Sequence, residues 1–494
     1  MSRERKLLFD ASLVFVMGLL AAIFGYLIRV ILSRQLSLEE FGLFYAVFTF
    51  VSFFIVFRDF GLGQALAKFI PQFLVKKEYG KIKASIKFAF FINLFMGMIF
   101  ATFFIIFSDY LAINYFKNEL AKSLLIILSA YFVLYAIYRL IILIFLGFQK
   151  SKIYSLNLFF INFFVFIGIL IFKKFGVLNP AISYLFAGLM GIIFGFILLF
   201  KSFSYFKYVE NNSYELKLKL FYYGFPILLA SIGATFIGQI DTLLLIKFRT
   251  LPEVGIYNVV LPTAMLLITF GSALAMAMLP FVSEYWEKKK FKELSNILLD
   301  IYKKSFIIIA PIGLTLFIFS DLILKVLFGE SFISGSIALK ILCIGSIFFS
   351  VAVINNNVLA AIGKPKEVTK LILFAALLNL IINLILIPQY GIIGAALATS
   401  ASYFVVLILS TYLVNQSVKL KIPILDWIKI FFAGVAFTLL VNLFKNILEM
   451  NVLLETTVVL IIGLIGYFLI LKIIGIDVFG LFRLMRPDFI NHKI

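Results

Sequence analysis

The chain has 494 residues, of which 63% are hydrophobic and only 14% are charged, and its formal net charge at pH 7 is +20. Because about a quarter of the residues of a soluble domain are charged, this composition excludes a soluble fold and indicates a helical protein with many membrane spans. The single cysteine and the single histidine exclude a disulfide framework and a His/Cys metal site, and the lysine surplus fits the orientation of membrane loops rather than nucleic-acid binding.

Fourteen apolar runs of roughly 20 residues predict an all-α membrane protein with fourteen transmembrane helices. The first run follows a charged N-terminal stretch and is long enough to span, so we expect a retained helix rather than a cleaved signal. The runs cover residues 12–32, 42–57, 84–107, 123–146, 153–172, 180–200, 221–246, 256–280, 305–320, 336–362, 369–388, 392–414, 425–444 and 453–474.

The basic residues predict the orientation of these helices. If the loops alternate between two sides, the termini and the even-numbered loops hold 32 of the 44 Lys and Arg residues, against 9 in the odd-numbered loops. By the positive-inside rule, both termini are cytoplasmic, and we expect the protein in the cell membrane. This count places Arg58 in the cytoplasmic loop after the run 42–57. Three basic residues remain inside the predicted spans: Arg29, Arg139 and Lys340.

The cytoplasmic loop 284–304 carries apolar residues at helical spacing among its lysines. This pattern predicts a helix lying on the anionic lipids of the membrane surface, with a solvated connector as the alternative. The apolar positions are Phe291, Leu294, Ile297, Leu298 and Ile301.

An internal repeat divides the chain. Shifted by 213 residues, the segment 37–47, SLEEFGLFYAV, falls on the segment 250–260, TLPEVGIYNVV. Later segments match at similar shifts, so the first six spans repeat as the next six. Three glycine pairs correspond in this way: Gly42 and Gly255 at a shift of 213, Gly147 and Gly363 at 216, and Gly176 and Gly391 at 215.

An even number of spans in each copy predicts two six-helix bundles with the same orientation, related by a pseudo-two-fold axis along the membrane normal. Two further helices follow them. The expected boundaries are residues 1–200, 201–414 and 415–494. Bundles related in this way typically rock about a site near the middle of the membrane, which gives alternating access.

Several motifs stand out over residues 11–414. They are LSRQLSLEEFGLF at 32–44, DFGLG at 59–63, the segment from Ile240-Asp241 to EVGIY at 253–257, GKPK at 363–366, and the segment 379–399. With these motifs the chain resembles the polysaccharide-biosynthesis flippases, which belong with the multidrug and toxin extruders and the peptidoglycan-lipid flippases in one exporter superfamily.

The resemblance implies a V-shaped pair of bundles around a central cavity. Such a protein moves a polyprenyl-diphosphate-linked oligosaccharide from the inner to the outer leaflet, has no catalytic residues, and uses no cofactor beyond a coupling proton or sodium ion. The resemblance also implies a groove for the lipid tail beside the two extra helices. We expect a monomer.

Ionisable residues inside a span are costly and predict function. Arg139 lies eight residues before Gly147, about 12 Å deep at 1.5 Å per residue, and a guanidinium binds phosphate bidentately. Substrate contact, a structural partner and snorkelling are the alternatives for Arg139. Arg29 and Lys340 lie nearer the outer helix ends and either line the cavity or snorkel.

Asp241 is the only carboxylate well inside a predicted span. The repeat pairs it with Ile28, next to Arg29, so an Arg29–Asp241 pair made in one state and broken in another would couple transport to a proton or sodium ion at Asp241. A static buried pair is the alternative.

Asparagines are concentrated in the tenth and eleventh spans. Their amides fit sugar hydroxyls, with Asn356 as the candidate for substrate binding, but they fit hydrogen bonds between helices equally well. They are Asn355, Asn356, Asn357, Asn379 and Asn383.

Two other functions compete with the flippase. A drug exporter of the same superfamily would favour acidic groups in the cavity, whereas the spans hold three basic residues and one acidic residue. A polytopic glycosyltransferase or polymer ligase would need a large outer loop with acids or histidine, and general acid–base chemistry has little to work with here. We therefore expect a transporter and no enzyme.

Overall fold

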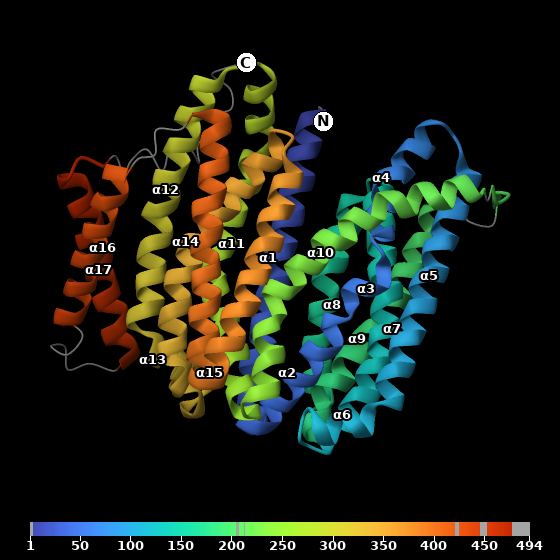
Figure 1. Ribbon diagram of the computed structural model, residues 1–494, viewed down its shortest axis with the longest axis horizontal. Helices are drawn as coiled ribbons and strands as arrows, with labels where there is room; N and C mark the ends of the chain where they lie inside the picture. The colour runs from blue at the N-terminus through green and yellow to red at the C-terminus, as the bar shows by residue number, and fades with distance from the viewer. Residues whose placement is uncertain (1–2, 204–206, 212, 420–423, 445–451, 477–494) are drawn as a thin grey trace. The chain divides into compact units, whose positions relative to one another are not determined.

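The computed structural model describes residues 3–203, 207–211, 213–419, 424–444 and 452–476, and the secondary structure of these residues is helical (Figure 1). Helices satisfy every backbone hydrogen bond within one segment, which a bilayer core demands. In chain order they are α1 (Arg3–Gln35), α2 (Leu38–Phe53), α3 (Ile55–Asp59), α4 (Leu62–Val75), α5 (Tyr79–Ile106), α6 (Ser108–Asn114), α7 (Leu120–Gly147), α8 (Ser151–Ile171), the 3-10 helix η1 (Lys173–Leu178), α9 (Asn179–Ser202), α10 (Tyr214–Phe248), α11 (Leu251–Glu287), α12 (Phe291–Ile318), α13 (Ser320–Phe328), the 3-10 helix η3 (Glu330–Gly335), α14 (Ser336–Ala361), α15 (Pro365–Val418), α16 (Ile424–Phe444) and α17 (Val452–Ile473).

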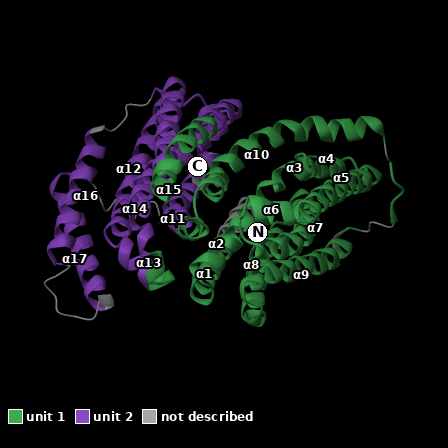
Figure 2. Ribbon diagram, turned by 60° about the horizontal axis from the view of Figure 1, so that its bottom comes forward, with its two compact units in different colours: residues 1–259, 326–332, 376–395 green, residues 260–325, 333–375, 396–494 purple. Residues whose placement is uncertain are grey.

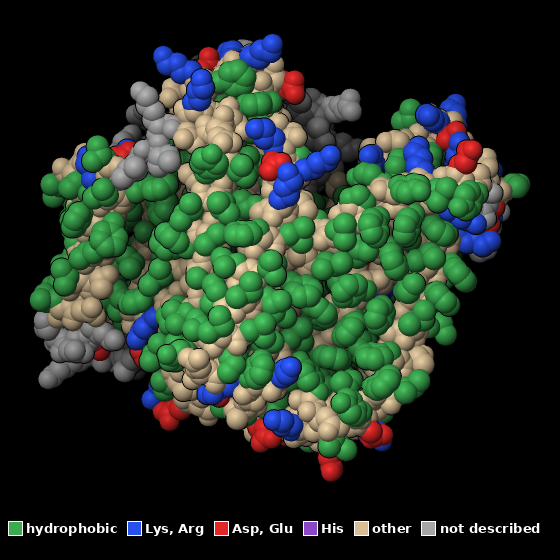
Figure 3. All heavy atoms as spheres, in the orientation of Figure 1, with side chains coloured by type: hydrophobic (Ala, Val, Ile, Leu, Met, Phe, Trp, Pro, Cys, Tyr) green, Lys and Arg blue, Asp and Glu red, His purple; other side chains and the backbone are tan. Residues whose placement is uncertain are grey.

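Thirteen helical segments of the described chain are long and apolar enough to cross a membrane. One of them, α15, is divided by a kink at Gly391, where φ is 55° and ψ is −130°. Because the two parts of α15 match the predicted runs 369–388 and 392–414, the fourteen predicted spans are confirmed. On the face shown in Figure 3, charged side chains gather mostly near helix ends, and apolar side chains cover the stretches between them.

The backbone repeats where the sequence repeats. Gly176 has φ 55° and ψ −128°, almost the values of Gly391, its counterpart at a shift of 215. The turn before α8 and the turn before α15 also match, but the left-handed residues are Gln149 and Gly363, at φ 56° and 83°. The structural shift there is 214, so the pairing of Gly147 with Gly363 was two residues out of register.

The repeated loop motif begins two helices that meet. Ser37 and Glu40 form a capping box at the start of α2, since each side chain accepts the backbone N–H of the other residue. Gly42 lies directly against the start of α11, where a Cβ on Gly42 would overlap the carbonyl oxygen of Leu251. Gly255 contacts Gly42 in return. The two copies of the motif therefore pack against each other through their equivalent glycines.

The contacts divide the chain into two compact units, coloured in Figure 2. Unit 1 comprises residues 1–259, 326–332 and 376–395, and unit 2 comprises residues 260–325, 333–375 and 396–494. In unit 1, α7 packs against α2, α4, α5 and α9, and α10 packs against α2 to α5. In unit 2, α12 packs against α14 and α16, and α16 packs against α17. The boundaries at residues 200 and 414 follow the repeat and remain a prediction.

The predicted helix in the loop 284–304 is present, but it is part of a longer helix. Only residues 288–290 form a turn, since α11 ends at Glu287 and α12 begins at Phe291 and continues to Ile318. Leu294 and Leu298 are fully buried against protein, whereas Phe291 is 42% exposed. The contact of this helix with anionic lipids stays a prediction.

Candidate functional site

The second span of unit 1 is broken at the level of Arg58. Helix α3 ends at Asp59, Phe60 and Gly61 take left-handed conformations with φ 48° and 71°, and α4 starts at Leu62. Gly61 fits because its Cα lies against the backbone of Gly224 on α10, where a side chain would clash. Discontinuous membrane helices commonly mark binding sites.

Arg58 was assigned to a cytoplasmic loop by the sequence, and that assignment is wrong. Its side chain is 1% exposed inside unit 1. Nη1 donates a hydrogen bond to the carbonyl oxygen of Phe132 at 3.2 Å, and the guanidinium carbon lies 5.4 Å from the ring centroids of both Phe132 and Tyr135. The Nε atom is buried without a hydrogen-bond partner. The candidate span runs from Leu38 to Asp59 and so includes Arg58.

Asp59 is held by neutral donors. The backbone N–H of Gly63 lies 3.1 and 3.2 Å from its two carboxylate oxygens, and Nδ2 of Asn93, on α5, donates to Oδ1 at 3.0 Å. Asp59 therefore satisfies an N–H group at the start of α4 that the helix break would leave free.

Arg29, on α1, turns toward the interior of unit 1. Nη1 donates to the carbonyl oxygen of Gly25 at 3.1 Å, and the guanidinium lies 5.4 Å from the ring centroid of the buried Tyr45. Its charge also acts on Tyr184. The Nε atom is buried without a partner, and Arg29 forms no ion pair with Asp241. The structure thus does not contain the static pair, and the alternative in which the pair is broken in this state stands.

Arg139, on α7, is half-buried one turn beyond Tyr135 and two turns beyond Phe132, which places all three on one face of the helix. Its charge repels that of Arg58. Within the described part of the chain, Arg139 makes no hydrogen bond, ion pair or ring contact, so its donors are available to a ligand.

Tyrosine rings lie beside two of the arginines, Arg29 and Arg58. Tyr184, on α9, lies 5.4 Å from Tyr131 between ring centroids, and Tyr131 lies 5.4 Å from Tyr135. We call this set the arginine–tyrosine cluster. It consists of Arg29, Arg58, Arg139, Tyr45, Tyr131, Tyr135 and Tyr184.

The arginine–tyrosine cluster concentrates positive charge inside unit 1. Three guanidinium groups lie within one bundle, and none of them is bonded to a carboxylate in the described residues. Cationic groups inside a membrane protein persist when they have a function or a partner. Sequence analysis identified two of these arginines and missed the third.

Asp241, on α10, is 1% exposed and forms a second polar centre in unit 1. The Tyr257 hydroxyl donates to its Oδ2 at 2.5 Å, and Nδ2 of Asn383 donates to its Oδ1 at 2.6 Å. Asn383 also donates to Oδ1 of Asn379 at 3.0 Å, and its own Oδ1 is buried without a partner. Two neutral donors thus hold the buried carboxylate.

The other two predicted substrate residues lie in unit 2. Lys340, on α14, is bound to Asp321 with an Nζ–Oδ2 distance of 3.3 Å. Partial burial raises the pKa of Asp321, but hydrogen bonds from Ser336 and Lys340 and the lysine charge outweigh it, so the pKa lies below its ordinary value. Asn356 is half-buried, and its Oδ1 has no partner.

The neighbouring Asn355 has a structural role. It accepts a hydrogen bond from the Tyr302 hydroxyl at 2.5 Å and donates to Ser410 and Thr411 at 3.0 and 2.9 Å. The amides predicted as one cluster therefore divide: Asn355 ties helices of unit 2 together, Asn379 and Asn383 surround Asp241, and Asn356 has a free acceptor.

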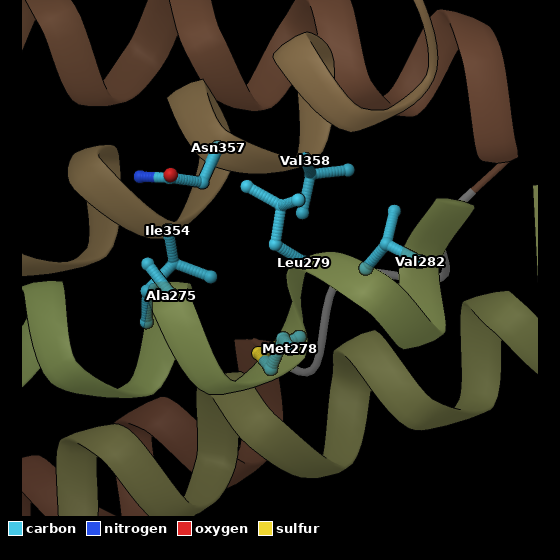
Figure 4. Close-up of a pocket in the computed structure, with 7 residues that line it drawn as sticks. All are labelled: Ala275, Met278, Leu279, Val282, Ile354, Asn357 and Val358. Carbon is cyan, nitrogen blue, oxygen red and sulfur yellow. The ribbon is translucent and has the colours of Figure 1, made fainter. Parts of the chain in front are cut away.

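An apolar pocket of about 160 Å³ lies between α11 and α14 (Figure 4). Its lining contains one polar side chain, Asn357, and no charged group. None of Arg29, Arg139, Asp241, Lys340 and Asn356 lines it. Among the described residues, no three His, Cys, Asp or Glu side chains come together as metal ligands.

The chain matches two protein families and is similar to several known membrane proteins. A family described as polysaccharide biosynthesis protein matches residues 7–286, and a second family, MatE, matches residues 226–385. An uncharacterized membrane protein of Methanocaldococcus jannaschii is 31% identical over 96% of this chain and 97% of its own. The probable low-salt glycan biosynthesis flippase Agl15 of Haloferax volcanii is 28% identical over 52% of this chain and 55% of its own.

Solved structures share the fold. The lipid II flippase MurJ in an inward closed conformation superposes with a TM-score of 0.74 at 19% identity, over 94% of this chain and 98% of that chain. An inward-facing multidrug resistance MATE family transporter of the MOP superfamily superposes with a TM-score of 0.66 at 15% identity, over 82% and 94%. The predicted all-helical exporter fold is therefore confirmed.

Proposed function

Because this chain belongs to the polysaccharide biosynthesis protein family, it is a membrane transporter rather than an enzyme, and we propose that it flips a polyprenyl-diphosphate-linked oligosaccharide from the inner to the outer leaflet by alternating access. The arginine–tyrosine cluster is the observation that carries this proposal. The proposal includes the cell membrane, cytoplasmic termini and a monomer, supported by the loop charges and the family.

The charges of the cluster support an anionic substrate. A diphosphate offers several oxygens that guanidinium groups bind bidentately. Arg29 and Arg139 are only half-buried, and N–H donors of both are without a hydrogen-bond partner in the described structure. A cationic drug would meet repulsion from the same groups, which disfavours the drug exporter. The free acceptor of Asn356 fits a sugar hydroxyl. Lys340 is engaged by Asp321, so its contribution to substrate binding remains a prediction.

Deleting the gene tests the substrate class. We expect a lipid-linked oligosaccharide to accumulate facing the cytoplasm, measured by its protection from a membrane-impermeant label in sealed vesicles. Arg139→Gln and Arg29→Gln should each lower the rescue of flipping about tenfold or more, since a hydrogen bond to a charged group contributes about 1.5 to 3 kcal/mol. Lys122→Gln removes an exposed cation bound to Asp109 and serves as the control. Normal outer-leaflet glycan in the deletion strain would contradict the proposal.

We also propose that transport is coupled to a proton or sodium ion at Asp241. The buried carboxylate, with the unpartnered Oδ1 of Asn383 beside it, supports a site whose occupancy changes between states. Such an ion biases the equilibrium only by its differential affinity for the two states. Asp241→Asn should abolish the dependence of flipping on sodium or pH, whereas Asp300→Asn, an exposed pair with Lys304, should not. An unchanged dependence in Asp241→Asn would refute the coupling.

A further inference from the structure

The counter-charge of the arginine–tyrosine cluster is Asp59. We propose that Asn93 and the first turn of α4 keep the Asp59 carboxylate from forming an ion pair with Arg58. The Arg58 guanidinium then stays available to an anion, and the nearby negative charge of Asp59 limits how tightly that anion binds. This inference rests on the proposed function, because it assigns a positioning residue to the phosphate site of the flippase.

The geometry separates two adjacent opposite charges. Asp59 and Arg58 follow each other in the chain, and the charge of Asp59 acts on the guanidinium. They nevertheless form no ion pair within the described residues, because the oxygens of Asp59 face Gly63 and Asn93 at 3.0 to 3.2 Å. The broken helix produces this arrangement, since the N–H of Gly63 is free only where a helix starts.

Arg58 is left incompletely bonded as a result. Its one hydrogen bond in the described structure goes to the Phe132 carbonyl, and its Nε is buried without a partner. A buried guanidinium normally takes a bonded carboxylate, because a buried charge without one is costly. The carboxylate adjacent in the chain, Asp59, is bonded to Gly63 and Asn93 instead, which is the arrangement expected of a residue whose partner arrives as a ligand.

The separation also sets how tightly an anion binds. If Asp59 closed onto Arg58, an incoming phosphate would have to displace a carboxylate, and binding would weaken. If Asp59 carried no charge, three arginines would hold the phosphate without any opposing charge, and release would slow. The restrained carboxylate gives intermediate affinity, which suits a transporter that must release its cargo on the other side.

The experiment measures binding of inorganic pyrophosphate to the purified full-length protein in lipid nanodiscs by calorimetry. We expect Asp59→Asn to tighten binding at least about tenfold, because Arg58 then acts on the phosphate without the opposing charge of Asp59 beside it. Asn93→Ala frees Asp59 to approach Arg58 and should weaken binding several-fold. In an Arg58→Gln background, Asp59→Asn should change the affinity much less than in the wild type.

Controls separate this inference from simpler explanations. Asn at position 59 keeps an acceptor for the Gly63 N–H, so the variant can fold, and Asp109→Asn makes the same chemical change at an exposed site outside the cluster. If Asp59 only caps α4, Asp59→Asn lowers the unfolding temperature without tightening binding, and the inference is overturned. If the wild type binds no pyrophosphate, or Arg29→Gln and Arg139→Gln leave binding unchanged, the proposed phosphate site itself fails.

Discussion

The second span of the first repeat and its counterpart in the second repeat begin alike and then differ. Both follow a copy of the same loop motif, and Gly42 and Gly255 hold the equivalent place in α2 and α11. The first copy then breaks into α2, α3 and α4, whereas α11 runs without interruption from Leu251 to Glu287. The two copies thus share the loop motif and the start of the following helix, and they differ in whether that helix is continuous.

The difference is centred on one position. At a shift of 213, Gly271 stands where the first copy has Arg58. Gly271 lies directly against the backbone of Ser350 on α14, with no room for a side chain. Arg58 instead reaches α7, the helix equivalent to α14, where it donates a hydrogen bond to Phe132. The second copy uses this position for close helix packing, and the first copy uses it to hold a charge. The anion site that we propose therefore belongs to one half of the duplicated chain.

The largest expected loss of stability comes from adding a side chain at Gly61, where the helix breaks between α3 and α4. Gly61→Ala must adopt a left-handed conformation, at about 1 to 2 kcal/mol, and must also displace the Gly224 backbone, at about 1 to 3 kcal/mol. We expect a loss of about 3 kcal/mol in the free energy of unfolding, measured by denaturation in detergent. Gly363→Ala is the matched control, because Gly363 has φ +83° but open space around it. Equal losses in both variants would show that the contact with Gly224 contributes nothing.

A smaller loss of stability is expected from a substitution at Gly271, in the continuous helix α11. Gly271→Ala adds a methyl group that overlaps the carbonyl oxygen of Ser350, so overpacking should cost about 2 kcal/mol despite the better helix propensity of alanine. Gly238→Ala, in a helix with nothing within 4 Å of the new methyl group, should be neutral or stabilising. Thermal unfolding of the two variants measures the difference. If Gly271→Ala left the stability unchanged, the close packing of Gly271 against Ser350 would not explain why the second repeat has glycine at this position.

Sequence reasoning predicted the fold well because its signals are local. Apolar length gave the fourteen spans, and a repeated motif gave the duplication, down to the matching backbone of Gly176 and Gly391. The site was predicted in part. A charge inside an apolar run, as at Arg29 and Arg139, stands out by itself.

Arg58 was missed because it follows the apolar run 42–57, and the continuation of the helix depends on tertiary contacts. Gly61 reaches the backbone of Gly224, more than 160 residues away, and Asp59 needs Asn93 on another helix. Likewise the apolar face at Leu294 and Leu298 reads the same whether lipid or protein covers it. Periodicity shows that a face is buried and not what buries it.

The smallest expected effect concerns Lys340, the basic residue predicted inside a span of the second repeat. Lys340 lies near a helix end with its side chain 32% exposed, bound to an Asp321 side chain that is 53% exposed. Because solvent screens such a pair, Lys340→Gln should change the free energy of unfolding by about 0.5 kcal/mol or less. In contrast to Arg139→Gln, it should leave the flipping rate within about twofold of the wild type if the anion site is confined to the first repeat. A loss of flipping as large as that of Arg139→Gln would place a substrate contact in the second repeat. The proposed anion site would then not be confined to the first repeat.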